Sequence, residues 1–479
     1  MSDKDQLVQI ARNAMRANGF EPDFPPDARA QLARLNAQAT NGLRDLRSLP
    51  WSSIDNDDSR DLDQIEVCLA DGNRTRVLVA IADVDGLVTK DTPLDRHARL
   101  NTTSVYTPAV IFPMLPPELS TDRTSLNQDV DRAAIVIDMT VDAAGTVAAS
   151  DVYRAAVHNR AQLTYSAVAA WLEGQGPEPA AVSKVAGLDE QLRLQDRVAK
   201  ALRAARDAEG ALEFDRAELR PVVDDEGVRD LHTDTANSAT RLIEDFMVAA
   251  NGVTARFLSA HGVASIRRVV KTPERWDRIV ALAAQHGATL PPQPDAKALQ
   301  QVLKAQRIAA PDRFSDVSLA VIKLLGRGEY VAELATQPST HFALAVAGYN
   351  HSTAPNRRYP DVITQRLLKA VFAGEQVPYS MADLTEIANH CTAQEDAANK
   401  VERLTKKAAA ALWLQDRIGE QFDAIVTGAG PKGTWVRLAG KPVEGRLDRG
   451  AQGLDVGDRV RVELISTDPP HGFIDFARV

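Results

Sequence analysis

Cysteine and long apolar runs are scarce in this sequence of 479 residues. Cys68 and Cys391 are too few and too far apart in the chain for a disulfide framework or a Cys/His zinc pattern. The longest apolar stretches, such as residues 408–414, fall well short of the roughly 18 residues that a membrane span needs. The N-terminus has no apolar core of a secretory signal. We therefore expect a cytoplasmic protein that has no membrane partner.

The sequence also has no excess of basic over acidic residues. The chain has 56 Lys and Arg against 65 Asp and Glu, a net charge of −9, which argues against nonspecific coating of nucleic acid. A basic channel inside an acidic shell is still compatible with this balance. With 44% hydrophobic and 25% charged residues, the composition is that of an ordinary globular protein. The length suffices for one large domain with a small companion.

The spacing of apolar residues divides the chain into three regions. Residues 1–48 have helical spacing on both sides of the break FEPDFPPD. Residues 49–418 begin with alternating hairpins near 65–81 and 134–153, then become mainly helical, with a long helix expected over about 381–422. Residues 419–479 contain five short alternating strands, which predict a small OB-type barrel. The fold class is therefore α+β, with a helical N-terminal segment, a large mixed sheet-and-helix domain and a small C-terminal barrel.

The most informative segment is the acidic run from Asp55 to Glu66, where carboxylates occupy half of the positions. A solvated acidic loop is the ordinary interpretation of such a run. This run leads into an alternating strand, so Asp61 and Asp63, two residues apart, are expected to share one face. With Asp55 arriving from the preceding loop, three carboxylates would surround one volume, which suits Mg²⁺ or Mn²⁺. Such sites hold paired ions about 3.5 to 4 Å apart for in-line attack on phosphodiesters.

An EF-hand calcium loop is the rival interpretation of the same run. Counted from Asp55, an aspartate stands third and Glu66 stands twelfth, as that loop requires. The sixth position is Arg60, however, where the loop needs a glycine for its sharp turn. We therefore favour the paired-ion site and expect Asp57 and Asp58 to be exposed loop residues.

The acidic run is the first of several motifs that follow one another along the chain. These motifs are Ile54-Asp55 with Asp61-Leu62-Asp63, residues 78–84, Tyr106-Thr107-Pro108, residues 112–120, residues 210–215, residues 242–251, residues 341–344, residues 354–361, Arg366-Leu367-Leu368 and Val401-Glu402-Arg403. In this order, from about Trp51 to Glu402, they resemble the catalytic RNB domain of the RNase II family. The last region, with the phrase LDVGDRV, resembles ribosomal-protein-type RNA-binding OB modules.

The resemblance implies a hydrolytic exoribonuclease that threads single-stranded RNA through a channel. Such an enzyme removes nucleotides one at a time from the 3′ end and releases nucleoside 5′-monophosphates. It also implies Mg²⁺ or Mn²⁺ as cofactor and no obligate protein partner, so we expect a monomer. Two alternatives stay open: an RNA-binding protein that keeps the channel but has impaired catalysis, and a hydrolase of short oligoribonucleotides.

The resemblance also assigns the metal and catalytic residues. Asp55, Asp61 and Asp63 match the family's metal-binding and catalytic aspartates. Gln64 stands where the family usually has a fourth aspartate, so an oxygen ligand is kept and a negative charge is lost. Arg357 matches the arginine that holds the scissile phosphate, and a guanidinium is a natural partner for the charge that develops there.

The remaining matches concern the substrate. Tyr106 matches the tyrosine that packs against the terminal base, and Phe214 is the opposing stacking residue. Arg358 and Tyr359 belong to the same motif as the phosphate-binding arginine and are expected to contact substrate. Glu402 matches a glutamate near the 3′-terminal nucleotide that takes part in catalysis.

One further departure concerns the surfaces that hold RNA. Members of the family commonly begin with two cold-shock domains, which the N-terminal helical segment is too short to contain. The barrel would then bind RNA by stacking on Trp435, Phe473 or Phe476.

Overall fold

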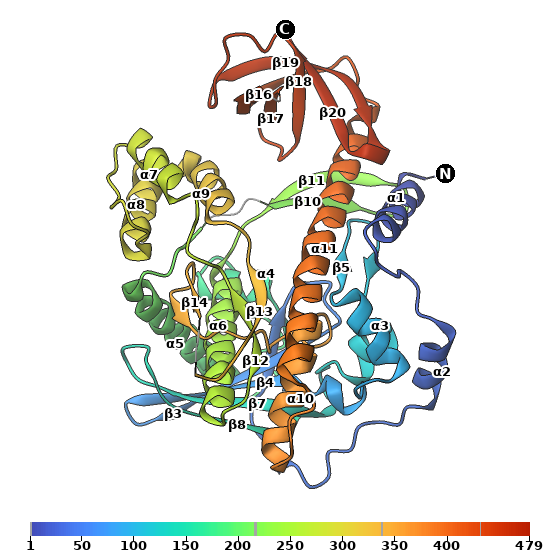
Figure 1. Ribbon diagram of the computed structural model, residues 1–479, viewed down its shortest axis with the longest axis vertical. Coiled ribbons are helices and arrows are strands. Elements are labelled where there is room, and N and C mark those ends of the chain that lie inside the picture. The colour runs from blue at the N-terminus through green and yellow to red at the C-terminus, as the bar shows by residue number, and fades with distance from the viewer. Residues whose placement is uncertain (1, 215–217, 337–338, 432) are drawn as a thin grey trace.

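The computed structural model describes residues 2–214, 218–336, 339–431 and 433–479, and it has the α+β class that the sequence predicts (Figure 1). A large sheet covered by helices forms the lower part, and a small barrel lies above it. Among the described residues, no helix is long and apolar enough to cross a membrane. The helices are α1 (Asp3–Ala17), α2 (Pro26–Arg34), α3 (Pro93–Asn101), α4 (Tyr165–Leu172), α5 (Leu188–Glu209), α6 (Ser238–Ala260), α7 (Trp276–Gln285), α8 (Ala296–Ala309), α9 (Pro311–Leu325), α10 (Tyr359–Ala373) and α11 (Met381–Gln415).

The central sheet has seven strands in the order β1-β8-β7-β4-β3-β2-β9. Both predicted hairpins are present, as β3–β4 and β7–β8, and these four strands form its middle. Strand β2 pairs with β9 in parallel and carries Asp55 at its end, opposite Thr164. The strands are β1 (Arg44–Asp45), β2 (Ser52–Asp55), β3 (Gln64–Asp71), β4 (Arg74–Ala82), β7 (Asp131–Val141), β8 (Val147–His158) and β9 (Ala161–Thr164).

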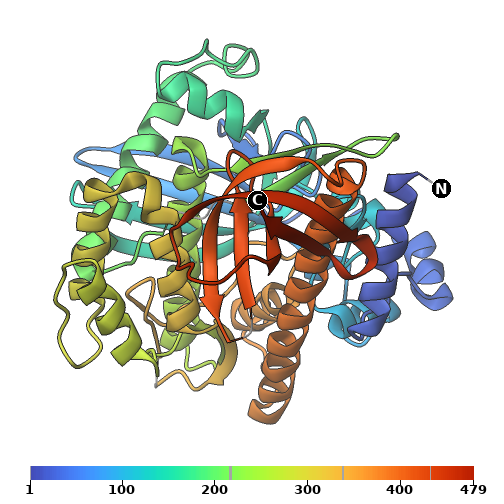
Figure 2. The ribbon, with the colours of Figure 1, turned by 90° about the horizontal axis from the view of Figure 1, so that it is seen from above.

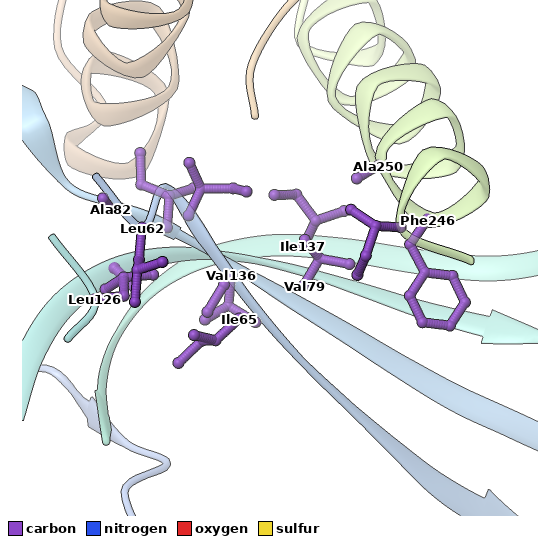
Figure 3. Packing of buried hydrophobic residues seen from close by; sticks show 14 of the residues in the cluster. Leu62, Ile65, Val79, Ala82, Leu126, Val136, Ile137, Phe246 and Ala250 are labelled. Atoms are coloured by element: carbon purple, nitrogen blue, oxygen red, sulfur yellow. The ribbon is translucent and has the colours of Figure 1, made fainter. Parts of the chain in front are cut away.

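One face of this sheet packs against helix α6. The side chain of Asn237 caps this helix by accepting a hydrogen bond from the Thr240 N–H, and apolar residues recur along it at helical spacing. Figure 3 shows Phe246 and Ala250 of the helix beside Val79 of the sheet. These residues belong to the largest hydrophobic cluster, which fixes the sheet against the helices.

The long helix α11 runs from the base of the molecule to the barrel (Figure 1). It ends at Gln415, several residues before the predicted end, and β16 begins at Gln421. Between them Gly419 has a φ of 90°, in the left-handed region that favours glycine, and this turn starts the barrel. Helix α1 packs along the upper half of α11 through Ala11, Met15 and Val401.

The C-terminal residues form a closed barrel, β16-β17-β18-β20-β19, as predicted. Seen from above, it lies over the sheet and the helices that surround it (Figure 2). Phe476 is fully buried in its core, so it cannot stack on RNA; Phe473 is 59% exposed and Trp435 is half-buried. The strands are β16 (Gln421–Gly430), β17 (Gly433–Leu438), β18 (Glu444–Arg449), β19 (Arg459–Asp468) and β20 (Phe473–Arg478).

Smaller elements link the barrel to the body. Helices α7, α8 and α9 share a hydrophobic cluster of their own, and α9 contacts the barrel through an Arg437–Asp316 ion pair of 2.9 Å. Residues 212–214 form no strand, and within residues 339–345 only Thr340–His341 does. The remaining strands are β5 (Val105–Tyr106), β6 (Ile111–Phe112), β10 (Glu218–Val223), β11 (Val228–Asp234), β12 (Ser265–Val269), β13 (Glu329–Glu333), β14 (Thr340–His341) and β15 (Val346–Ala347).

Candidate active site

The predicted acidic loop connects strands β2 and β3 at one end of the sheet. Leu62 is 1% exposed and points into the core, while Asp61 and Asp63 both line the pocket described below. The alternation expected of a strand therefore holds here, although β3 begins only at Gln64. Asp57 and Asp58 are exposed, as expected. Strands flank this loop where an EF-hand needs helices, so the EF-hand alternative does not apply.

Asp63 is the most buried of the three aspartates, with 2% exposure. Its Oδ1 accepts a hydrogen bond of 2.9 Å from the backbone N–H of Asn356. Its Oδ2 is buried without a hydrogen-bond partner and lies 3.4 Å from the Nε of Arg357. Burial raises the pKa of the Asp63 carboxyl to about 7, although the charge of Arg357 opposes this shift. A buried, incompletely satisfied carboxylate is the kind of group that a cation would stabilise.

The other two aspartates are held by protein donors. Asp55 Oδ1 accepts hydrogen bonds from the Asn56 backbone N–H at 2.8 Å and from the Ser59 hydroxyl at 2.9 Å. Burial raises the pKa of Asp55. The Tyr106 hydroxyl donates to Asp61 Oδ2 at 3.1 Å. Burial also raises the pKa of Tyr106, which keeps the phenol protonated as that donor at neutral pH.

The loop before α10 presents two arginines to the same pocket. Asp361, which is fully buried, accepts two hydrogen bonds from Arg358, at 3.0 and 2.8 Å, and one from the Ala354 N–H at 2.8 Å. This buried carboxylate fixes the loop, so the neighbouring Arg357 is positioned against Asp63. The Arg357 side chain stays 45% exposed toward the pocket, where it can meet a ligand.

A pocket of about 960 Å³ brings most of the predicted site residues together. Residues of the aspartate loop and the two arginines line it, and so do Tyr106 and Phe214. The remaining two predicted residues do not line it. The predicted residues that line this pocket, here called the main pocket, are Asp55, Asp61, Asp63, Gln64, Tyr106, Phe214, Arg357 and Arg358.

Tyr359 and Glu402 lie elsewhere. Tyr359 is 1% exposed, and its hydroxyl donates to Asp95 at 3.0 Å inside the core. The expectation that Tyr359 contacts substrate does not agree with this position, because its ring packs between helices and the sheet. Glu402 lines a neighbouring pocket, yet its Oε1 accepts a hydrogen bond of 3.0 Å from the Tyr106 backbone N–H. It therefore supports the strand that carries the tyrosine.

Three further arginines, which the sequence patterns did not predict as site residues, also line the main pocket and form an arginine-rich wall. Arg203 and Arg206, one turn apart on α5, both donate to the buried Asp245 of α6. Burial, together with the neighbouring Asp245, raises the pKa of the adjacent Glu244. Arg268 lies in the same lining. The spacing of the two arginines on a helix was the available signal, but their partner is distant in sequence and only the fold brings it near.

The donor set suits a hard divalent ion without forming a complete cage. Among the described residues, no three carboxylate, imidazole or thiolate side chains converge closely enough to hold a metal by themselves. The three aspartates nevertheless line one pocket. Burial is the main cause that raises the pKa of Asp55 and of Asp63, and the negative charge of Asp61 adds to both shifts. Mg²⁺ is commonly held by one or two carboxylates plus substrate phosphates and waters. The aspartates fit that arrangement.

Gln64 offers a direct test of the metal ligands. It is 7% exposed, pairs with Ile81 in the sheet and lines the main pocket. We expect Gln64→Asp to shift the midpoint of a Mg²⁺ or Mn²⁺ titration to lower concentration, because it adds a charge beside Asp63. The wild type should prefer Mn²⁺, which binds such sites more tightly.

The control for this titration is Asn56→Asp, which adds the same charge at an exposed position of the pocket lining. A larger shift for Gln64→Asp than for Asn56→Asp supports a ligand role for residue 64. Coinciding midpoints of wild type and Gln64→Asp would mean that residue 64 does not touch the ion.

The chain is similar to known proteins along nearly its whole length. Residues 43–374 match the RNB domain, and residues 420–479 match the RNase II-type exonuclease C-terminal S1 domain. Ribonuclease R of Escherichia coli (strain K12) is 30% identical over 508 residues, which cover 97% of this chain and 61% of that protein. The chain thus spans less than two thirds of this relative's length.

Solved structures of other proteins have a fold similar to that of this chain. Mycoplasma genitalium RNase R in complex with ribose methylated single-stranded RNA has a TM-score of 0.89 at 21% identity, covering 100% of this chain and 78% of that chain. Yeast Ssd1, a pseudonuclease, has a TM-score of 0.71 at 17% identity, covering 97% of this chain and 57% of that one. The fold alone therefore does not separate a nuclease from a pseudonuclease. Because the RNB match covers well over half of its residues, this chain belongs to the RNB domain family, and it ends in an RNase II-type S1 domain.

Proposed function

We propose that this protein is a divalent-metal-dependent 3′-to-5′ exoribonuclease that degrades single-stranded RNA to nucleoside 5′-monophosphates. The observation that carries the proposal is the convergence of Asp55, Asp61, Asp63 and Arg357 on one pocket. Crowded carboxylates repel one another, so a protein that only binds RNA gains nothing from keeping them without a cation. The relatives' names support a ribonuclease, and the shared domain supports the type of chemistry.

In the proposed reaction, the residues of this chain position the scissile phosphate. Arg357 donates to the nonbridging oxygens, where negative charge grows during attack. Asp55, Asp61 and Asp63 would hold Mg²⁺ or Mn²⁺, which supplies an activated water and neutralises charge on the phosphate. Asp361 acts through the two arginines by fixing their loop.

Aromatic side chains would hold the 3′-terminal nucleotides in the main pocket. Tyr106 and Phe214 both line it, and base stacking on such rings contributes roughly 1 to 3 kcal/mol per base without sequence preference. Glu402 would act by positioning Tyr106, because its Oε1 accepts a hydrogen bond from the Tyr106 backbone N–H. All of these groups come from one chain, so the proposed monomer needs no second subunit for the reaction.

The proposed function is tested by incubating the protein with 5′-end-labelled poly(A) and Mg²⁺ or Mn²⁺. The proposal predicts progressive shortening from the 3′ end and accumulation of AMP. Binding without any hydrolysis would favour the impaired RNA-binding alternative, which the likeness to a pseudonuclease keeps in view. Hydrolysis limited to very short oligonucleotides would favour the third interpretation.

A second expectation concerns how the ion is bound. Because the aspartates do not form a complete cage, the free protein should bind Mn²⁺ weakly, and a non-hydrolysable RNA analogue should tighten binding by supplying phosphate oxygens. Calorimetric titration of Mn²⁺ with and without the analogue measures this difference. Equal affinities in the two titrations would contradict ion binding shared between protein and RNA.

A further inference from the structure

Helix α1 has no role in the reaction proposed above, although it lies beside the elements that carry Tyr106 (Figure 1). A capping box fixes its first turn: the Ser2 hydroxyl accepts a hydrogen bond from the Asp5 N–H at 3.2 Å, and the Asp5 carboxylate accepts one from the Ser2 N–H at 3.1 Å. Positions 5, 9, 13 and 16 are exposed, whereas the opposite face is buried. The buried residues are Leu7, Ile10, Ala11, Ala14 and Met15.

The C-terminal half of α1 packs against both partners of the hydrogen bond that holds Tyr106. Met15 is 1% exposed and belongs to one buried cluster with Val105 of β5 and Val401 of α11. Val105 directly precedes Tyr106, and Val401 directly precedes Glu402, which accepts the hydrogen bond from the Tyr106 N–H at 3.0 Å. A closely packed cluster transmits displacements, so the position of α1 affects both residues. The other buried members are Ala11, Ala14, Phe20, Phe112, Ala397 and Ala398.

The N-terminal half of α1 is fixed to the upper part of α11. Leu7 and Ile10 are buried in a second cluster with residues 408, 409 and 412 of α11, and hairpin β10–β11 packs against this cluster. The surface ion pair of Lys4 with Asp225 of the hairpin, at 2.6 Å, contributes little to stability. Apolar contacts along its length therefore hold α1 on α11 as one unit.

The chain that follows α1 makes a second contact with the segment that leads to Tyr106. The Glu21 N–H donates to Asn101 Oδ1 at 3.0 Å, and Asn101 Nδ2 donates to the Glu21 carbonyl at 2.8 Å. Asn101 is 4% exposed and is the last residue of α3. Three residues later, the Ser104 N–H donates to the carbonyl of Arg357 at 3.0 Å. The N-terminal segment therefore fixes the start of the stretch that carries Tyr106 and contacts the backbone of Arg357.

Tyr106 depends on such support because its own strand is very short. Strand β5 has two residues and pairs with β6, which also has two. An isolated two-stranded hairpin is only marginally stable, so what packs beneath it decides its position. The Tyr106 hydroxyl donates to Asp61, but this bond fixes the end of the side chain and not the strand. The packing of β5 on α1 and α11 therefore sets where the ring lies.

We infer that the segment from α1 to Glu21, here called the N-terminal brace, positions Tyr106 for stacking on the 3′-terminal base of the RNA. Among the described residues that line the main pocket, none belongs to the brace, so it acts through Val105, Val401 and Asn101. This inference rests on the proposed function for the role of Tyr106, but it does not require that hydrolysis occurs.

The test compares two labelled RNA ligands by fluorescence anisotropy in EDTA, so that hydrolysis is absent. One ligand is an oligoadenylate of about 10 nucleotides, within the range of site sizes seen for single-strand binding modules. The other is the same oligonucleotide with an abasic 3′-terminal nucleotide. The ratio of their two dissociation constants reports the contribution of the terminal base, because all other contacts are shared.

The main variant is Met15→Ala, which leaves a cavity between α1, β5 and α11. Met15→Leu is the conservative variant, because it nearly keeps the volume of the side chain. Met139→Ala is the matched control, since it opens a similar cavity at a fully buried position of the central sheet. Urea unfolding establishes that each variant is folded under the binding conditions.

We expect the wild type, Met15→Leu and Met139→Ala to prefer the intact ligand by roughly tenfold, the scale of one stacked base, and Met15→Ala to prefer it by about twofold or less. A full preference in Met15→Ala would overturn the inference, and so would an equal loss in Met139→Ala. If Met15→Ala does not fold, Phe20→Leu removes fewer contacts from the same cluster and should lower the preference in the same direction. A full preference in this variant would also overturn the inference.

Failure of the proposed function is seen separately, in the wild type. A wild type that binds both ligands equally would contradict stacking of the terminal base on Tyr106, and the inference would be overturned with it. Absence of poly(A) hydrolysis by a wild type that still prefers the intact ligand would contradict the proposed exoribonuclease and leave the positioning of Tyr106 supported.

Discussion

Replacing Asp63 with asparagine should abolish RNA hydrolysis while leaving RNA binding intact or tighter. The substitution removes the buried charge that faces Arg357 and the proposed ion, but it does not block the pocket. A metal site supplies several kcal/mol of transition-state stabilisation, so we expect turnover to fall by roughly 10³-fold or more. Single-turnover hydrolysis and anisotropy measure the two effects. Equal loss of binding and hydrolysis in folded protein would contradict this role.

The same substitution should stabilise the protein in EDTA at pH 8. The native pKa of Asp63 is about 7, above the value of 3.8 expected in the unfolded chain, so ionising it above pH 7 costs folding free energy. A shift of this size corresponds to about 4 kcal/mol at high pH. Between pH 7 and pH 4 the native wild type takes up the proton that the unfolded state releases, so the wild type regains stability as the pH falls.

Urea unfolding of wild type and Asp63→Asn at pH 8 and pH 5 measures this linkage. We expect a clear gain in the free energy of unfolding for the variant at pH 8 and a smaller gain at pH 5. Asp57→Asn is the control, because Asp57 is exposed and should change stability little at either pH. A gain that does not depend on pH would mean that Asp63 is not the group whose ionisation is costly.

Arg357→Ala should lower turnover by roughly 10² to 10³-fold, the scale found when one preorganised transition-state donor is removed. The guanidinium of Arg357 is held beside Asp63 by a loop that Asp361 fixes. Its contribution to catalysis therefore depends little on any ordering of this loop by the substrate. The effect should fall on kcat more than on KM, since the charge that it meets grows in the transition state.

Arg357→Lys is the matched variant, because it keeps the charge and loses the planar fork. We expect it to recover part of the turnover. Turnover within a few-fold of wild type for Arg357→Ala would show that this side chain does not contact the reacting phosphate.

Local patterns were sufficient to predict much of this molecule. Alternation identified both central hairpins and the five barrel strands, because strand faces repeat every two residues. The same rule placed Asp61 and Asp63 on one face, with Leu62 buried between them. These features depend on neighbours in sequence, so sequence alone contains the signal.

Features that depend on distant partners were not predictable. Tyr359 follows two pocket arginines directly, but the first turn of α10 rotates its ring into the core toward Asp95. The arginine wall exists because Asp245 of another helix collects Arg203 and Arg206. Whether three aspartates close into a full metal cage also depends on such contacts, and here protein donors engage Asp55 and Asp61 instead.

The most direct test of the proposed exoribonuclease uses a single-stranded RNA labelled only in its 3′-terminal nucleotide, incubated with Mn²⁺ and either wild type or Asp63→Asn. The wild type should release the label as a nucleoside 5′-monophosphate before any shorter oligonucleotide carries it, and Asp63→Asn should release none. Label that stays in oligonucleotides, or release by both proteins alike, would contradict 3′-to-5′ hydrolysis at this site.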